Sequence, residues 1–122
     1  MKHVRIGLVG AGFMGKTHLW SVRNLPFFYN TAEPGFTAEV AAVCASSPER
    51  GEMCAREYGM PRVATVEEMI ADPNIDVIDI CTPNPLHFEV ARAAVFAGKS
   101  VLCEKPLTVT AAEAYELARL AE

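Results

Sequence analysis

Two kinds of segment are missing from this 122-residue sequence, and each absence excludes a class of protein. No apolar stretch approaches the roughly 20 residues that a membrane-spanning helix needs, and Met1–His3 lead into a predicted strand rather than into a secretion signal. No run of basic residues occurs, and 15 acidic against 11 basic side chains give a net charge of −4. We therefore expect no nucleic acid and no membrane as partners, and we predict a cytoplasmic location.

Closely spaced cysteine pairs are also missing, because the four cysteines of the chain show no C-x-x-C pattern. Cys44, Cys81 and Cys103 each lie near the end of a predicted buried strand, where cysteine behaves as a small hydrophobic residue. We therefore predict reduced thiols in the core, with neither a disulfide nor a metal site. With 51% hydrophobic residues, the chain is long enough for one globular domain with a core of its own.

Predicted strands and helices alternate along the whole chain. The predicted strands cover residues 3–9, 39–45, 62–64, 77–81 and 100–103. The predicted helices begin at about residues 13, 48, 66, 84 and 111, and the first is expected to end near residue 25. Short apolar strands that alternate with helices indicate a parallel sheet covered on both faces. We therefore predict an α/β fold with three α/β/α layers, a doubly wound Rossmann sheet with strand order 3-2-1-4-5.

Four of these helices follow a residue that can accept a hydrogen bond from the first helical turn. These predicted N-caps are Ser47, Thr65, Asn84 and Thr110. Thr65 and Thr110 are each followed three residues later by a glutamate, which completes a capping box. Gly59 and Gly98 stand where a helix is expected to end.

A glycine-rich turn follows the first predicted strand directly. Residues 10–15 read Gly-Ala-Gly-Phe-Met-Gly and fit the pattern G-x-G-x-x-G. The first glycine allows a tight turn, the second lets a diphosphate approach the main chain, and the third lets the next helix pack closely. The free N–H groups and the positive dipole end of that helix then face the anion. The turn therefore predicts a dinucleotide site.

The same residues also fit the phosphate loop of nucleoside triphosphatases, G-x-x-x-x-G-K-T, from Gly10 onward. In that loop Lys16 and the following threonine would serve the terminal phosphate and its magnesium ion. Phe13 and Met14 stand where the loop would wrap a phosphate, and their bulk suits the start of a helix packed on a sheet. Asp79, a weak candidate for a magnesium-holding acid, is placed within a strand rather than at its end. The glycines alone leave two nucleotide classes open.

Three polar segments follow predicted strands at their carboxyl ends, namely residues 10–12, 82–84 and 104–106. The carboxyl ends of parallel strands lie at one edge of a sheet, and ligands bind there beside the point where the strand order reverses. We expect these three segments to meet at that edge, which is a more specific signal than any one motif.

Two longer motifs add a family resemblance that covers nearly the whole chain. Residues 79–87 read DICTPNPLH and residues 98–106 read GKSVLCEKP. Together with the glycine turn they resemble the N-terminal domain of the glucose–fructose oxidoreductase, inositol dehydrogenase and MocA family. The resemblance implies a nicotinamide dinucleotide, NAD(P), as cofactor in place of a nucleoside triphosphate. It also implies hydride transfer between NAD(P) and a sugar, a polyol or a related small alcohol or carbonyl substrate.

Members of that family continue into a second, α+β domain, which is absent from these 122 residues. We therefore expect residues 1–122 to be one NAD(P)-binding domain, an N-terminal fragment that binds cofactor without turnover of its own. The apolar surface that a missing domain would leave bare predicts association into a homo-oligomer. The alternative to an oxidoreductase is a module that senses a dinucleotide without catalysing a reaction. A phosphate-loop triphosphatase is the third and less favoured alternative.

The resemblance also implies roles for individual residues. The diphosphate would lie against the main-chain N–H groups of Gly10, Gly12, Phe13 and Met14. The nicotinamide-ribose side would be lined by Thr82, Asn84 and His87. The nicotinamide ring would lie beside Glu104 and Lys105, with Lys105 as the catalytic residue that polarises or proton-couples the substrate oxygen. A lysine suits that role because its ammonium group changes pKa readily when it is partly desolvated.

Several residues have a structural alternative. His87 could satisfy a local carbonyl, and Lys105 could be an ordinary surface lysine. His18 lies on the apolar face of the first helix, so we expect a core histidine rather than a ligand. Asp79 is unusual in a buried strand, and we predict that it is a hydrogen-bonded structural acid rather than a base.

The end of the second strand bears on the choice between NAD and NADP. NAD enzymes usually place an acid there to bind the ribose hydroxyls, but the sequence continues Ala45-Ser46-Ser47 without one. Ser46 or Ser47 could bond a 2′-phosphate, and Arg50 could neutralise it, whereas the neighbouring Glu49 opposes this. We therefore favour NADP slightly over NAD, with Ala45, Ser46 and Arg50 as contacts.

Overall fold

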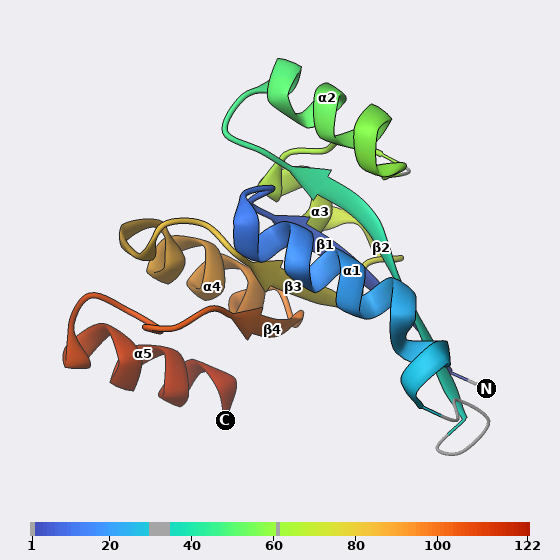
Figure 1. Cartoon of the computed structure of the whole chain (residues 1–122). Coiled ribbons are helices and arrows are strands. Elements are labelled where there is room, and N and C mark those ends of the chain that lie inside the picture. Colours follow the sequence, from blue (N-terminus) through green and yellow to red (C-terminus); the bar gives the residue numbers. More distant parts are fainter. Residues whose placement is uncertain (1, 30–34, 61) are drawn as a thin grey trace.

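The computed structural model describes residues 2–29, 35–60 and 62–122, which form a four-stranded sheet with helices on both faces (Figure 1). The strands are β1 (Lys2–Val9), β2 (Phe36–Cys44), β3 (Val77–Ile80) and β4 (Ser100–Cys103). The helices are α1 (Phe13–Phe28), α2 (Pro48–Tyr58), α3 (Val66–Ala71), α4 (His87–Phe96) and α5 (Ala111–Ala121). A short 3₁₀ turn, η1 (Asn84–Leu86), precedes α4.

Neighbouring strands are parallel throughout, and the sheet has the order β2-β1-β3-β4. The strand predicted at residues 62–64 is wrong, because this segment makes only a single bridge between Val43 and Val63. Thr65 already starts the capping box of α3, so too few residues are left for a ladder. The bridge lies on the outer side of β2, where the third strand was expected. The three-layer parallel fold is therefore confirmed, and the four strands that form follow the predicted order.

Side chains of β1 and β3 enter two separate apolar clusters, one on each face of the sheet. Leu8 packs with Leu19 of α1 and with residues of α2. Ile78 and Ile80 pack in the other cluster, together with residues of α3, α4 and α5. Successive side chains of a strand point to opposite faces. Asp79 lies between the two isoleucines and therefore faces α1.

Three of the four predicted helix caps form. Ser47 caps α2, and Thr65 and Thr110 complete capping boxes at α3 and α5. The prediction that Asn84 caps its helix is wrong, because Asn84 lies inside η1 and its Nδ2 donates to the carbonyl oxygen of Pro106 at 2.8 Å. The acceptor lies 22 positions farther along the chain, so the residues around Asn84 do not predict this hydrogen bond.

Helix α1 continues past its predicted end near residue 25 to Phe28. Pro26 lies in its last turn, where the missing N–H removes a single main-chain bond. The N–H of Tyr29 then closes the helix on the carbonyl oxygen of Leu25 at 2.9 Å. Within the described residues, no helix is long and apolar enough to cross a membrane.

Helix α1 begins in close contact with the glycine turn. A Cβ atom on Gly15 would lie 2.0 Å from the carbonyl oxygen of Gly10, far inside van der Waals contact. Gly10 has a φ of +99°, and a Cβ atom there would lie 2.7 Å from the main chain of Cys81. The two glycines thus let α1, β1 and the end of β3 approach each other main chain to main chain.

We expect Gly15→Ala to lower the free energy of unfolding by about 2 kcal/mol or more, because a methyl group between main-chain atoms forces the helix away from the sheet. Urea unfolding followed by circular dichroism measures the loss. Gly12→Ala is the matched control, since a Cβ atom on Gly12 meets no atom within 4 Å. Equal stability of the two variants would contradict the close packing at Gly15.

Candidate functional site

The carboxyl ends of the strands enclose an open cavity of about 670 Å³, within the usual size range of small-molecule sites. Its walls are the glycine turn, the end of β2 with the start of α2, and the segment between β3 and α4. The predicted site residues that line it are Gly10, Gly12, Phe13, Met14, Ala45, Ser46, Arg50 and Thr82. The tertiary structure therefore assembles a large part of the predicted site around one space.

Other cavity residues were not assigned from the sequence. They include Val66, Pro85, Leu86, Glu89 and Val90. Leu86 and Val90 belong to a row of apolar residues at helical spacing. Such spacing predicts a buried helix face, but it does not show which residues of that face lie at the edge of the sheet. The start of α4 at that edge is the signal that could have identified them, because residues in the first turn of such a helix face the ligand side.

The glycine turn leaves room in front of α1. A Cβ atom on Gly12 would meet nothing within 4 Å, and Gly12 is the N-cap of α1 without a side-chain hydrogen bond to the helix. The first turn of α1 contains no acidic residue. Its free N–H groups and the positive end of its dipole therefore face this space uncompensated, which favours a bound anion.

A buried hydroxyl group in the cavity wall has no protein partner. Thr82 Oγ1 makes no hydrogen bond among the described residues, although it is shielded from solvent. A buried polar atom without a partner costs roughly 1–3 kcal/mol. Thr82 lines the cavity, so a ligand whose polar groups reach this hydroxyl would remove that cost.

The end of β2 offers one positive charge to the cavity. The hydroxyl oxygen of Ser47 accepts the main-chain N–H of Arg50 at 3.2 Å and thereby caps α2. The side chain of Arg50 is left to line the cavity together with Ala45 and Ser46. Glu89 is the charged residue of opposite sign in the lining, on the wall formed by α4.

Asn84 and His87 lie behind the cavity wall rather than in it. The His87 ring is buried, with Nδ1 3.0 Å from the carbonyl oxygen of Pro106 and Nε2 2.8 Å from that of Thr82. Asn84 donates to the same Pro106 carbonyl. These two side chains therefore tie the segment after β3 to the segment after β4. Their contacts with the nicotinamide side stay predictions.

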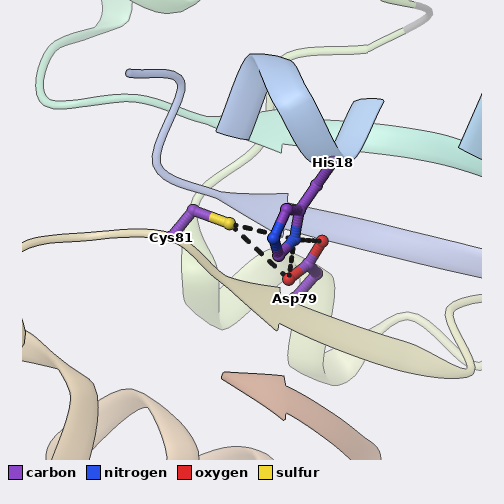
Figure 2. A group of neighbouring side chains, drawn as sticks. All are labelled: His18, Asp79 and Cys81. Atoms are coloured by element: carbon purple, nitrogen blue, oxygen red, sulfur yellow. Dashed lines mark hydrogen bonds and ion pairs between the residues drawn. The ribbon is translucent and has the colours of Figure 1, made fainter. Parts of the chain in front are cut away.

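Side chains from α1 and from the end of β3 meet at the same edge, as Figure 2 shows. Nδ1 of His18 lies 2.9 Å and 3.0 Å from the two carboxylate oxygens of Asp79, and Nε2 lies 2.7 Å from Oε1 of Glu104. The expected core histidine is therefore wrong: His18 bridges two carboxylates, and 19% of its side chain is exposed. Helical spacing predicts only which residues lie beside His18 on α1. Asp79 lies in β3 and Glu104 follows β4, so the spacing could not predict these contacts.

At pH values below the pKa of His18 the ring is an imidazolium, and both ring nitrogens then donate to the carboxylates of Asp79 and Glu104. Burial by itself would lower the pKa of His18, but the hydrogen bonds and charges of Asp79 and Glu104 outweigh burial and raise this pKa above its ordinary value. Burial also raises the pKa of Asp79, and the His18 cation opposes that shift. Asp79 is 1% exposed and hydrogen-bonded, as predicted for a structural acid.

The same cluster contains residue types that bind metals, and the candidate ligand atoms of His18, Asp79 and Cys81 lie within 4.8 Å of one another. Burial and the charge of Asp79 raise the pKa of the Cys81 thiol far above its ordinary range. The thiol therefore keeps its proton and donates toward Asp79 at 3.6 Å. Since His18 is committed to two carboxylates, the cluster is an internal hydrogen-bond network, and we assign no metal to it.

The segment after β4 carries the predicted catalytic lysine. Glu104 points inward to His18, and its Oε2 accepts the main-chain N–H of Lys105 at 3.3 Å. Lys105 is exposed, and no hydrogen bond or ion pair from the described residues holds its ammonium group. Glu104 and Lys105 do not line the cavity itself, and their contacts with a nicotinamide ring stay predictions.

Lys16 does not lie where a phosphate-loop lysine would. Its Nζ atom lies 4.8 Å from the centre of the Tyr58 ring in α2, and the hydroxyl of Thr17 donates to the carbonyl oxygen of Phe13 at 2.9 Å. The two side chains that would serve a terminal phosphate and its magnesium ion are thus engaged with the protein. The geometry therefore favours a dinucleotide over a nucleoside triphosphate.

A family model described as an oxidoreductase family with an NAD-binding Rossmann fold (GFO_IDH_MocA) matches residues 4–122. Levoglucosan dehydrogenase of Pseudarthrobacter phenanthrenivorans is 40% identical over 114 residues, which cover 93% of this chain and 29% of that protein. D-xylose 1-dehydrogenase (NADP(+)) of Hypocrea jecorina is 38% identical over 94 residues, which cover 69% of this chain and 23% of that protein.

A solved structure of levoglucosan dehydrogenase in complex with NADH and levoglucosan matches 98% of this chain, with a TM-score of 0.90 and 36% sequence identity. The match covers 32% of that structure. The chain thus spans about a third or less of the length of these relatives.

The His18 bridge makes stability depend on pH. Because the native pKa of His18 lies above the unfolded value of about 6.5, the bridge stabilises the native state fully below that pH and is lost as pH rises through the native pKa. We expect the urea midpoint to fall from about pH 6.5 upward and expect His18→Gln to flatten this part of the profile.

The matched control for this pH profile is His3→Gln. His3 pairs with Glu39 at the surface, where nearly half of each side chain is exposed, so its loss should leave the slope unchanged. A wild-type midpoint that is constant or rises over this interval would contradict a charged bridge.

Proposed function

This chain belongs to the oxidoreductase family with an NAD-binding Rossmann fold, and we propose that its cavity holds the diphosphate and the adenosine side of a nicotinamide dinucleotide. The observation that carries the proposal is the open space at Gly12, in front of helix N–H groups that no side chain caps. The unpartnered hydroxyl of Thr82 and the charge of Arg50 lie in walls of the same cavity. These features fit a diphosphate, which brings negative charge and acceptor oxygens.

When bound, the nicotinamide ring supplies or accepts a hydride at its C4 atom. The residues of this chain would bind and orient: Gly12, Phe13 and Met14 through main-chain N–H groups toward the diphosphate, and Thr82 toward the ribose. Lys105 is the proposed catalytic residue. No described residue binds its ammonium group, which can therefore bond an oxygen of the substrate, polarise it and move a proton at that atom.

A sugar or a polyol is the proposed substrate class of the whole protein. The relatives include enzymes named for levoglucosan and D-xylose, and one solved relative is a complex with NADH and levoglucosan. We also propose association into a homo-oligomer. Trp20, Phe27 and Phe28 form an exposed aromatic cluster on α1, and such surface favours association.

NADP is the slightly preferred form of the cofactor in this proposal. The end of β2 carries no acid to bind ribose hydroxyls, and Ser46 and Arg50 line the cavity there. Glu49, next to Arg50 in the first turn of α2, weakens the preference. One relative carries NADP(+) in its name and another was solved with NADH, so both forms occur among similar proteins.

Gly12→Val is expected to weaken binding of NADPH and NADH at least about tenfold, because a branched side chain fills the space that the diphosphate needs. The fold should be kept, since a Cβ atom there meets nothing within 4 Å. Calorimetric titration with NADPH, NADH and magnesium–ATP measures the effect. Lys16→Ala is the control and should leave nicotinamide binding unchanged. Unchanged NADPH and NADH binding in Gly12→Val, or magnesium–ATP binding lost in Lys16→Ala, would refute the proposal.

Arg50→Ala is expected to weaken NADPH binding about tenfold and NADH binding about twofold or less, because only NADPH carries the 2′-phosphate that the guanidinium would neutralise. The same titrations give both dissociation constants. Arg56→Ala, in the last turn of α2 and outside the cavity lining, is the matched control. Equal losses for the two cofactors would show that Arg50 does not read the 2′-phosphate.

A further inference from the structure

The segment after β4 is held from two directions. On the side of α1, Nε2 of His18 binds Oε1 of Glu104 at 2.7 Å. On the side of α4, Nδ1 of His87 lies 3.0 Å from the carbonyl oxygen of Pro106. Lys105 stands between these two anchored residues, and its ammonium group has no partner within the described parts of the chain. The arrangement fixes the neighbours of Lys105 and leaves its charged group available.

We propose that His18 is a positioning residue for Lys105. As an imidazolium it holds the carboxylate of Glu104, and the second oxygen of that carboxylate accepts the main-chain N–H of Lys105 at 3.3 Å. The main-chain N–H of Glu104 also donates to the carbonyl oxygen of Ile80 at 2.9 Å. The side-chain contacts act beyond this bond, where they orient the main chain of Lys105 and thus set where its ammonium group meets a ligand. The use of that ammonium group rests on the proposed function, whereas the positioning itself needs no cofactor.

The charge of the His18 ring makes the bridge effective. A cation between Asp79 and Glu104 compensates both acids, and hydrogen bonds between charged groups are the stronger ones. A neutral ring has one N–H and can donate to only one carboxylate. The side chain of Asp79 is 1% exposed and cannot turn to water, whereas that of Glu104 is 19% exposed. Glu104 is therefore the partner that is released when His18 loses its proton.

The other titratable groups around the ring do not replace its charge. The end of β3 contributes Asp79 and Cys81, and the end of β4 contributes Glu104 with Cys103 next to it. Burial raises the pKa of both thiols, that of Cys103 to about 11. Both thiols are therefore neutral at the pH values at which His18 titrates, and the ring faces two carboxylates as the single cation among these groups.

The other cations of α1 are engaged with the end of α2. Lys16 lies over the ring of Tyr58, and Arg23 donates to the carbonyl oxygens of Tyr58 and Gly59. Neither side chain reaches Glu104 in the structure. Release of Glu104 should therefore follow the titration of His18 alone.

NMR spectroscopy of the isotope-labelled chain tests the proposal without any ligand. The Cε1–H signal of His18 reports the ring titration, and the amide signal of Lys105 reports its surroundings and its order. We expect the Lys105 amide to shift with the same pH midpoint as His18. We expect its order parameter to fall there from about 0.85 to below about 0.6, the values of rigid and flexible backbone. An order parameter that is unchanged across the His18 midpoint would overturn the proposal.

Variants separate the charge of the bridge from its shape. The glutamine in His18→Gln keeps a hydrogen-bond donor but never carries a charge. The order parameter of the Lys105 amide should therefore be low at every pH at which this variant is folded. In Glu104→Gln, His18 still titrates against Asp79, but the Lys105 signal should no longer follow it. His3→Gln, the control, should leave Lys105 as in the wild type. A lower melting temperature in His18→Gln with an unchanged order parameter of Lys105 would show a structural bridge only and refute the positioning.

Cofactor titrations keep this proposal distinct from the proposed function. His18 does not line the cavity, so His18→Gln should change the dissociation constants for NADPH and NADH by less than about threefold. A wild-type chain that binds neither cofactor would refute the proposed function, while the coupled titration of His18 and Lys105 would still support the positioning. Normal cofactor binding with a Lys105 signal independent of His18 would refute the positioning alone.

Discussion

The close approach of main chain to main chain at the glycine turn is the constraint on which the other features depend. Gly10 and Gly15 have no side chains, so the start of α1 lies against the ends of β1 and β3. This approach aims the N-terminus of α1 at the cavity and brings His18 within hydrogen-bond distance of Asp79. A side chain at either glycine would move α1 away from the sheet. The N-terminus of α1 would then no longer face the cavity, and His18 would move out of hydrogen-bond distance of Asp79.

Some polar groups at the carboxyl edge of the sheet line the cavity, and others make hydrogen bonds within the protein that hold the site in place. The cavity is lined by the main chain of the glycine turn, by Thr82 with its buried hydroxyl and by Arg50 with its charge. His18 and His87 lie behind it and bind carboxylates or carbonyl oxygens of the protein. Support of this kind holds a functional side chain within a narrow range of positions, and the supporting groups bind the two residues that flank Lys105.

Local predictions succeeded where no distant group competes with the local contacts, and they failed where a distant partner decides the outcome. Thr65 and Thr110 cap their helices because the cap, the glutamate and the N–H groups lie within one turn. Residues 62–64 make only a bridge, because the length of a ladder depends on the neighbouring strand and on where the chain must turn next. Asn84 turns away from its own helix because the carbonyl of Pro106 comes within reach only in the folded chain.

The sequence by itself determined the parallel sheet and the anion-binding turn, because side-chain periodicity and the sterics of glycine act within a few residues. It also determined part of the cavity lining, since strand ends meet at one edge in this topology. Only the tertiary structure decided that His18 bridges Asp79 and Glu104, which lie 61 and 86 positions away along the chain. A local pattern cannot predict which side chains of the sheet His18 contacts, because these contacts depend on how α1 packs over the sheet.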